Sequence, residues 1–329
     1  MQLVKNNPPI ELQNAVQKLL KDFSPADLVL VGCSGGADSL ALAWCTQVVG
    51  QRLDLKVGAV IIDHQLFTNS AAVAIKTNEQ CIGLGLEPVI IKKVEVEKAH
   101  EGIEAAARVA RYKAFEEVLS ETNATALLLA HTQDDQAETI LMRLSRGSGA
   151  KSLSGMQAVN GKYLRPFLHI RKKIVHESLK LINLEPWQDP ANNDNQFLRV
   201  KVRNELMPKL IEILGDGAVN SLDKTSQLLR DDNQALEEIA QTYWNANSEV
   251  KTMGLDVVDI AKIPKAIRTR ILKIAALEAG VIPGPMTFEH IEAMDSLVTN
   301  WHGQGNVDLP GFVHAQRSGG RIKFHSSKL

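Results

Sequence analysis

Glycine and hydroxyl side chains gather in one short stretch, Ser34-Gly35-Gly36-Ala37-Asp38-Ser39, directly after the apolar run 28–31. A strand that leads through such a turn into a helix presents unpaired backbone N–H groups and a positive dipole end, which attract an anion. The glycines let the backbone approach phosphate without a Cβ clash, and the hydroxyls add hydrogen-bond donors. The alternative role for Asp38 is a helix N-cap. The stretch predicts a phosphate-binding loop.

Three other interpretations of this loop fit less well. A Walker A loop requires a lysine near its end, and none is present. A dinucleotide fingerprint requires G-x-G-x-x-G, whereas the glycines here are 32, 35 and 36, although Asp63 would suit a ribose. The segment 32–36 does satisfy the nucleophile-elbow pattern G-x-S-x-G with Ser34, but only about thirty residues precede it, and a hydrolase elbow follows several strands.

The elements around the loop predict a parallel sheet covered on both faces, because continuous apolar strands alternate with helical patterns. We expect strands at 28–31, 55–62, 89–91, 126–130 and 163–170, and helices at 10–23, 38–49, 71–84, 101–120, 134–145 and 174–182. The loop, Asp63-His64 and 131–135 each follow a strand. Ligands bind at the carboxyl ends of such strands, which places a site there.

The rest of the chain predicts a second, smaller and mainly helical domain. We expect helices at 197–214, 219–244, 263–280 and 287–298, with short strands within 307–324. At 329 residues the chain is about twice a usual domain, and we place the boundary near Gly215, giving domains 1–215 and 216–329.

Composition excludes several classes of protein. No stretch approaches the roughly 20 apolar residues of a membrane helix, and the N-terminus lacks a secretory apolar region. The three cysteines form no C-x-x-C pair, which argues against a disulfide scaffold and for a reducing compartment. The formal net charge is −1, but residues 162–209 carry ten Lys and Arg against five Asp and Glu, a local +5. Such a stretch can hold a polyanion or can be a solvated face.

The stretch 34–39 resembles the PP-loop of ATP pyrophosphatases, enzymes that split ATP into AMP and pyrophosphate. Four further segments, 104–112, 131–139, 189–194 and 197–203, extend the resemblance to the tRNA(Ile)-lysidine synthase family. The resemblance covers about 25–210 strongly and the C-terminal part more loosely. It implies a Rossmann-like α/β domain of the adenine nucleotide α-hydrolase type, and a short form without a further C-terminal domain.

The resemblance also implies an activity. Members of this family join the ε-amine of lysine to C2 of the wobble cytidine of an isoleucine tRNA with a CAU anticodon, through an adenylated tRNA, with release of AMP and pyrophosphate. The expected cofactors are therefore ATP and Mg²⁺, and the expected partners are this tRNA and L-lysine. We expect a cytoplasmic enzyme that does not bind membranes, and we leave a homodimer open.

Site residues follow from the matching positions. A carboxylate at Asp38 would repel a bare triphosphate, so we expect it to hold Mg²⁺. Asp135 and Glu138 form a carboxylate pair suited to the lysine ammonium, with a capping box led by Asp135 as the alternative. The expected residues are, for ATP, Ser34, Gly35, Gly36, Ala37, Asp38, Ser39 and Asp63; for lysine and catalysis, Asp38, Arg108, Arg111, His131, Asp135 and Glu138; for tRNA, His169, Arg171, Lys172, Lys173, Arg199 and Arg203.

Two departures and two alternatives accompany this interpretation. After Asp63-His64 the family commonly shows Gly-Leu-Arg, whereas Gln65-Leu66-Phe67 stands here. The usual Arg-Asn-x-Ile-Arg appears as 199–203 with valine and lysine in its second and third places. A PP-loop enzyme of tRNA 2-thiolation is the alternative enzyme, although its chemistry usually needs paired cysteines. A non-catalytic RNA-binding protein is the alternative from another class.

Overall fold

The structure is a computed structural model that describes residues 6–67, 69–96, 103–145, 149–188, 198–247 and 253–326. The chain divides into two compact units, Met1–Gln227 and Leu228–Leu329. The division falls inside the long helix α10 (Gly217–Ala246), which contributes residues to both units. The boundary expected near Gly215 lies two residues before this helix and stays a prediction.

The first unit contains a six-stranded sheet in the order β3-β2-β1-β4-β6-β5. Its strands are β1 (Leu28–Gly32), β2 (Lys56–Asp63), β3 (Val89–Lys93), β4 (Ala126–Leu128), β5 (Val159–Asn160) and β6 (Tyr163–Leu164). All pairs are parallel except β5 with β6, so β1, β2, β4 and β6 end at the same edge. The expected α/β class with a parallel sheet is confirmed.

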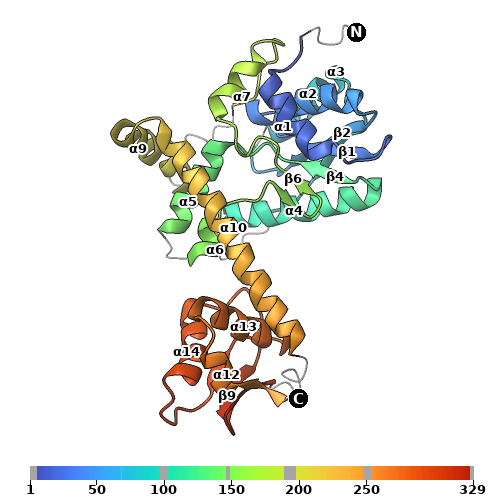
Figure 1. Cartoon of the computed structure of the whole chain (residues 1–329). Helices are drawn as coiled ribbons and strands as arrows, with labels where there is room; N and C mark the ends of the chain where they lie inside the picture. Colours follow the sequence, from blue (N-terminus) through green and yellow to red (C-terminus); the bar gives the residue numbers. More distant parts are fainter. Residues whose placement is uncertain are drawn as a thin grey trace. The chain divides into compact units, whose positions relative to one another are not determined.

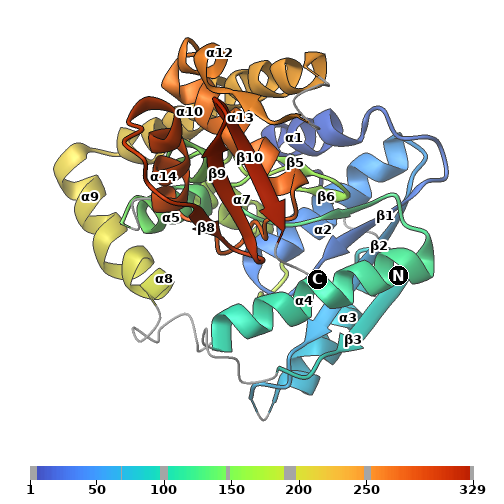
Figure 2. The ribbon, with the colours of Figure 1, turned by 90° about the horizontal axis from the view of Figure 1, so that it is seen from below.

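Helices cover both faces of this sheet, because side chains along each strand alternate between two apolar clusters. Val29 and Val31 of β1 pack on the side of α1 (Ile10–Leu20), α2 (Ala37–Arg52), α3 (Ser70–Gly83) and α7 (Lys172–Leu179). Leu30 packs on the other side, against Phe115 of α4 (Ile103–Thr122). Figures 1 and 2 show α4 along its own face of the sheet.

The segment after β4 departs from the sequence expectation in two places. The strand expected over 163–170 ends at Leu164, because two turns follow it, closed by the bonds Leu168 N–H to Arg165 O and Ile170 N–H to Phe167 O. Pro166, the second residue of the first turn, has no N–H to donate to a neighbouring strand. The helix expected over 197–214 is interrupted: α8 (Leu198–Lys201) and α9 (Met207–Leu214) flank a π-helical turn, η2 (Val202–Leu206). The helices α5 (Gln133–Leu144) and α6 (Gly149–Leu153) precede β5.

The second unit combines helices with a four-stranded antiparallel sheet in the order β7-β10-β9-β8. Its further elements are β7 (Leu255–Asp256), α12 (Val257–Ala261), α13 (Lys265–Glu278), α14 (Phe288–Thr299), β8 (Val307–Leu309), β9 (Val313–Ser318) and β10 (Arg321–Ser326). The guanidinium of Arg268 on α13 donates to buried Asp295 on α14 at 2.6 and 3.1 Å. This buried pair joins the two helices beneath the sheet. Across the described ranges, no helix has the length and apolar character needed to cross a membrane.

Candidate active site

Hydrogen bonds from its own hydroxyl groups fix the conformation of the loop between β1 and α2. The Ser34 N–H donates to Ser39 Oγ at 3.1 Å, and Ser39 Oγ donates to the Gly36 carbonyl at 2.9 Å. Gly35 has φ +78°, and a Cβ there would collide with the Thr77 hydroxyl, so only glycine fits without strain. The Ser34 hydroxyl lies 3.3 Å from Ser39 Oγ and contacts no imidazole among the described residues, which leaves the nucleophile-elbow interpretation without a base.

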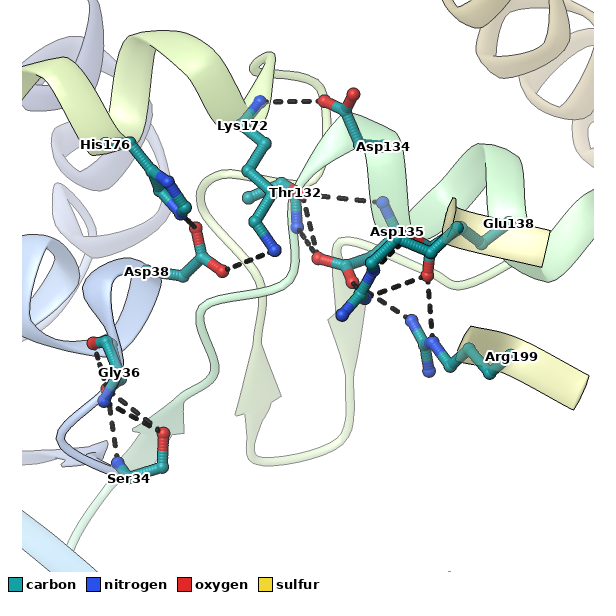
Figure 3. A network of polar contacts seen from close by, with 12 residues as sticks. Ser34, Gly36, Asp38, Thr132, Asp134, Asp135, Glu138, Lys172, His176 and Arg199 are labelled. Atoms are coloured by element: carbon teal, nitrogen blue, oxygen red, sulfur yellow. Dashed lines mark hydrogen bonds and ion pairs between the residues drawn. The ribbon is translucent and has the colours of Figure 1, made fainter. Parts of the chain in front are cut away.

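Asp38 lies in the first turn of α2 but does not cap it. The N-cap of α2 is Gly36, and no side chain caps it, so the N-cap interpretation of Asp38 is wrong. The carboxylate instead faces α7, where Lys172 Nζ lies 3.3 Å and His176 Nε2 lies 3.0 Å from its two oxygens. Figure 3 shows this carboxylate between the loop and the two basic side chains. Asp38 is thus a partly exposed carboxylate, beside the phosphate-binding loop, that could act as a metal ligand.

The end of β2 contributes Asp63 and His64. Asp63 is buried and accepts the Gln65 N–H at 3.0 Å, which fixes the turn after the strand. Arg111 of α4 donates from Nε to His64 Nε2 at 3.2 Å. Burial and the neighbouring Arg111 charge lower the pKa of His64 to about 4, so the imidazole is neutral and can accept this bond. Asp63, His64 and Arg111 therefore lie together at the carboxyl edge.

Asp135 and Glu138 lie at the start of α5. The helix begins with a capping box in which Thr132 is the N-cap and Asp135 is the third residue, so the alternative with Asp135 as N-cap is wrong. The Thr132 N–H and hydroxyl donate to Asp135 Oδ2 at 2.9 and 2.8 Å, which leaves Oδ1 for other partners. The capping role and an electrostatic role are both available to this carboxylate.

Two arginines from the α8–η2 segment complete a four-membered cluster of charges (Figure 3 draws its Asp135, Glu138 and Arg199). Arg199 donates to Asp135 Oδ1 at 3.1 Å and to Glu138 Oε2 at 3.0 Å. Arg203 donates to the same Asp135 oxygen at 3.1 Å and to Glu138 at 2.7 and 3.0 Å. Both arginines, expected on an RNA-binding face, thus engage the two carboxylates. The π-helical turn adds one residue to the helix and carries Arg203, a feature frequent at functional sites.

The charges of this cluster keep Asp135 ionised. Burial alone would raise the pKa of Asp135, but the charges of Arg199 and Lys172 and the Thr132 N–H bond outweigh it and lower the pKa to about 2. Lys172 therefore acts on both Asp135 and Asp38, which links the cluster with the loop. A carboxylate with so low a pKa is suited to binding a cation rather than to removing a proton at neutral pH.

His131 is close enough to Asp135 and Arg108 for both charges to act on its imidazole. His131 follows β4, and burial is the main reason that its pKa falls to about 4; the charges of Arg165, Arg199 and Arg108 add to the effect, while Asp135 opposes it. Arg108, on α4, donates to the Tyr112 hydroxyl at 3.4 Å. Glu116, also on α4, accepts the Tyr163 hydroxyl at 2.6 Å.

Several side chains of the basic stretch 162–209 are paired with carboxylates of the same chain. His169 Nδ1 lies 2.9 Å from the buried carboxylate of Asp223, and Arg171 donates to Asp134 at 3.3 Å. Of the residues expected to bind tRNA, Lys173 alone is exposed without a partner in the part of the chain that the structure describes. The segment 189–195, whose Asp-Pro start belongs to the resemblance, lies outside the described residues.

Two residues near the loop were missed by the sequence analysis. Trp187 donates its backbone N–H to the Gly35 carbonyl at 2.9 Å and stacks on Phe67, with ring centroids 5.2 Å apart. The departure at Phe67 thus places an aromatic ring near the loop. His176, the second partner of Asp38, was also missed, because nothing local distinguishes it from any exposed helical histidine.

A strand–loop–helix carrying Ser-Gly-Gly-Ala-Asp-Ser, with carboxylates and histidines at the same edge of a parallel sheet, defines a PP-loop nucleotide-binding protein. A family profile described as a PP-loop domain matches residues 8–210. A second profile, described as a TilS substrate binding domain, matches residues 255–322. The solved structure of a U34-tRNA thiolase from Methanococcus maripaludis, with its [4Fe-4S] cluster, has a similar fold: TM-score 0.56, 18% identity, covering 67% of this chain and 79% of that one.

More similar relatives identify the family. A tRNA(Ile)-lysidine synthase from Thermobifida fusca is 46% identical over 316 residues, which are 96% of this chain and 97% of the relative. One from Streptomyces coelicolor is 45% identical over 300 residues, 90% of this chain and 85% of the relative. The chain belongs to the tRNA(Ile)-lysidine synthase family.

Proposed function

We propose that this protein ligates L-lysine to C2 of the wobble cytidine of an isoleucine tRNA with a CAU anticodon. ATP adenylates the C2 oxygen and pyrophosphate leaves; the lysine ε-amine then attacks C2, and AMP leaves. The observation that carries this proposal is the glycine loop at 34–39, with Asp38, Asp135 and Glu138 near it at one edge of the sheet. Membership of the family, through relatives aligned over nearly the whole chain, supports it.

The loop suits the triphosphate of ATP. The Gly36 N–H, just before α2, has a long 3.4 Å contact with the Ser34 hydroxyl, and the Ser34 residue is exposed. These donors and the helix dipole favour negative charge at this place. Asp63, buried at the end of the adjacent strand, is proposed to accept a hydroxyl of the ribose.

Mg²⁺ fits Asp38. Its carboxylate is free of any capping bond and partly exposed, and magnesium is usually held by one or two carboxylates together with substrate phosphates. No group of three or more potential metal ligands exists within the described ranges, so phosphate and water oxygens would supply the other ligands. The ion would neutralise charge that develops between the α- and β-phosphates.

Asp135 and Glu138 are proposed to hold the lysine ammonium. In the structure they are shared with Arg199 and Arg203, so the amine would enter a cluster whose carboxylates already have cationic partners. The fixed ionisation of Asp135 favours this role, because a carboxylate at pKa about 2 retains its charge throughout the physiological range. His131 and Arg111 are proposed to contact the nucleotide or the lysine carboxylate.

The basic stretch is proposed to approach the tRNA backbone mainly through Lys173 and the outer faces of His169 and Arg171. Phosphate contacts of this kind make binding depend on salt, with a slope set by the number of contacts. A homodimeric state and a cytoplasmic location also stay predictions. The thiolation alternative has little support, because all three cysteines are free and buried.

The decisive experiment incubates the protein with ATP, labelled lysine and the minor isoleucine tRNA. We expect label in the RNA, with AMP and pyrophosphate formed in equal amounts. A methionine tRNA with the same anticodon is the matched control and should remain unlabelled. Formation of ADP, or binding of tRNA with no turnover of ATP, would refute the proposal and favour another nucleotide chemistry or a non-catalytic RNA-binding protein.

A further inference from the structure

Arg165 is a buried arginine without an acidic partner. Its side chain follows β6 and the residue is 5% exposed, yet it forms no ion pair with any described residue. Nη1 donates to the Gln157 carbonyl at 3.0 Å, and Nη2 donates to the Tyr112 hydroxyl at 3.4 Å. The buried Nε has no hydrogen-bond partner in the described part of the chain. A buried guanidinium normally requires a counter-charge, so this one lacks an expected partner.

A second guanidinium converges on the same phenol oxygen. Arg108 donates to the Tyr112 hydroxyl at 3.4 Å, and its Cζ lies 4.9 Å from the ring centroid. Like Arg165, Arg108 has no ion pair within the described residues. Two positive groups therefore share one neutral oxygen, an arrangement that favours the arrival of an anion between or beside them.

The pair lies at the edge of the sheet that carries the candidate active site. β6 is parallel to β4, with Leu164 opposite Leu128, so Arg165 and His131 follow neighbouring strands at the same edge. His131 Nδ1 is buried and has no hydrogen-bond partner among the described residues. The charges of Arg165 and Arg108 both act on this imidazole, which places all three side chains near one another. Arg165, Arg108 and His131 thus lie near one another at this edge and can each donate a further hydrogen bond.

We propose that Arg165, with Arg108 and His131, binds an oxyanion of the reaction, either a carboxylate or a phosphate. The inference rests on the proposed function, which supplies two such groups: the α-carboxylate of lysine and a phosphate of the nucleotide. A planar guanidinium pairs with either through two parallel hydrogen bonds, and the Tyr112 and Gln157 contacts hold that of Arg165 in a fixed orientation. Arg165 is the residue that sequence reasoning did not assign.

The test compares Arg165→Gln and Arg165→Lys with the wild type. Arg143→Gln is the matched control, because Arg143 also donates to two backbone carbonyls, at 2.8 and 2.9 Å, but lies outside the proposed site. Two reactions are measured: pyrophosphate release from ATP and tRNA without lysine, and transfer of lysine or of cadaverine, which lacks the carboxylate. Losing a charge-assisted contact should raise the affected KM about 10- to 100-fold.

The two sources give different results. If the oxyanion is the lysine carboxylate, Arg165→Gln raises the KM for lysine and leaves cadaverine transfer and pyrophosphate release unchanged. If it is a nucleotide phosphate, the KM for ATP rises in pyrophosphate release and the KM for lysine stays the same. Arg165→Lys should recover part of either loss, because it restores the charge without the planar fork.

Three results would overturn the proposal: shifts below about threefold in both KM values, a loss confined to tRNA affinity, or a loss matched by Arg143→Gln. If Arg165→Gln fails to fold, Arg108→Gln at an exposed position must move the same KM as Arg165→Lys. Calorimetric binding of lysine and of inorganic pyrophosphate to the wild type and to Arg108→Gln needs no turnover. This measurement therefore tests the oxyanion site separately from the reaction. If the wild type forms no lysidine, that result counts against the proposed function and not against the oxyanion site.

Discussion

Replacing Asp38 by asparagine separates the chemistry proposed for this carboxylate from its contribution to folding. The carboxylate pairs with Lys172 and His176, whose side chains are 27% and 44% exposed. Partly exposed pairs contribute at most about 1 kcal/mol each, and a carboxylate in the first turn of a helix contributes about 0.3–1 kcal/mol. Because no capping bond is lost, we expect Asp38→Asn to reduce the free energy of unfolding by about 1–2 kcal/mol.

The expected effect on catalysis is much larger. A carboxylate that holds a metal ion at a developing phosphate charge supports several kcal/mol of transition-state stabilisation, which corresponds to a rate loss on the order of 100-fold or more. The assay is tRNA-dependent pyrophosphate release at saturating ATP, measured beside a thermal melt of the same preparation. A melting temperature within a few degrees of the wild type, with nearly all activity lost, is the expected result.

Asp134→Asn provides the matched control. The Asp134 side chain is 22% exposed against 23% for Asp38, and it accepts bonds from Arg171 and from the Lys172 N–H at 2.7 Å. Its loss should cost similar stability while pyrophosphate release remains within a few-fold of the wild type. If Asp38→Asn keeps its activity, or if both variants lose activity equally, Asp38 does not have the proposed role.

Three further predictions concern the loop and the charge cluster. Gly35→Ala should lower both the free energy of unfolding and the affinity for ATP, because the new Cβ would collide with Thr77. The control Gly161→Ala also has a positive φ but open space around it, so it should cost only the left-handed strain of about 1–2 kcal/mol. Urea denaturation of both variants measures the difference. Asp135, with its pKa lowered from 3.8 to about 2, should stabilise the fold by about 2 kcal/mol above pH 4 and lose this as pH falls to about 2; an equal acid dependence in Asp135→Asn would contradict it. The same variant should raise the KM for lysine more than that for ATP, and an unchanged lysine KM would remove Asp135 from the pocket.

Local patterns in the sequence were sufficient to predict the loop and the sheet. The apolar run before Gly32 could only be a buried strand, and the glycines after it mark a turn wherever the rest of the chain lies. The position of Asp63 and His131 at one edge followed from the parallel order of strands. These features depend on neighbours a few residues away, which a single sequence displays.

Contacts between distant segments could not be predicted in the same way. The basic stretch near 170 and 200 suggested an open surface, but Lys172 meets Asp38 and Arg199 meets Asp135 and Glu138 across long separations. No period or motif links such partners, because folding brings them together through the placement of α7 and α8 rather than through local geometry. The sequence also did not predict that Arg165 is buried without an acidic partner, since an arginine after a short strand is ordinarily exposed.

The bond from Trp187 to the carbonyl of Gly35 gives this protein an optical reporter. Indole emission responds to its surroundings, and this indole stacks on Phe67 while its backbone is tied to the glycine turn. The other tryptophans are Trp44, Trp244 and Trp301, and phenylalanine at those three positions would leave Trp187 as the one tryptophan. Titrating that variant with nucleotide would then follow occupation of the turn directly, as a change in intensity or wavelength, without any radioactive or chemical label.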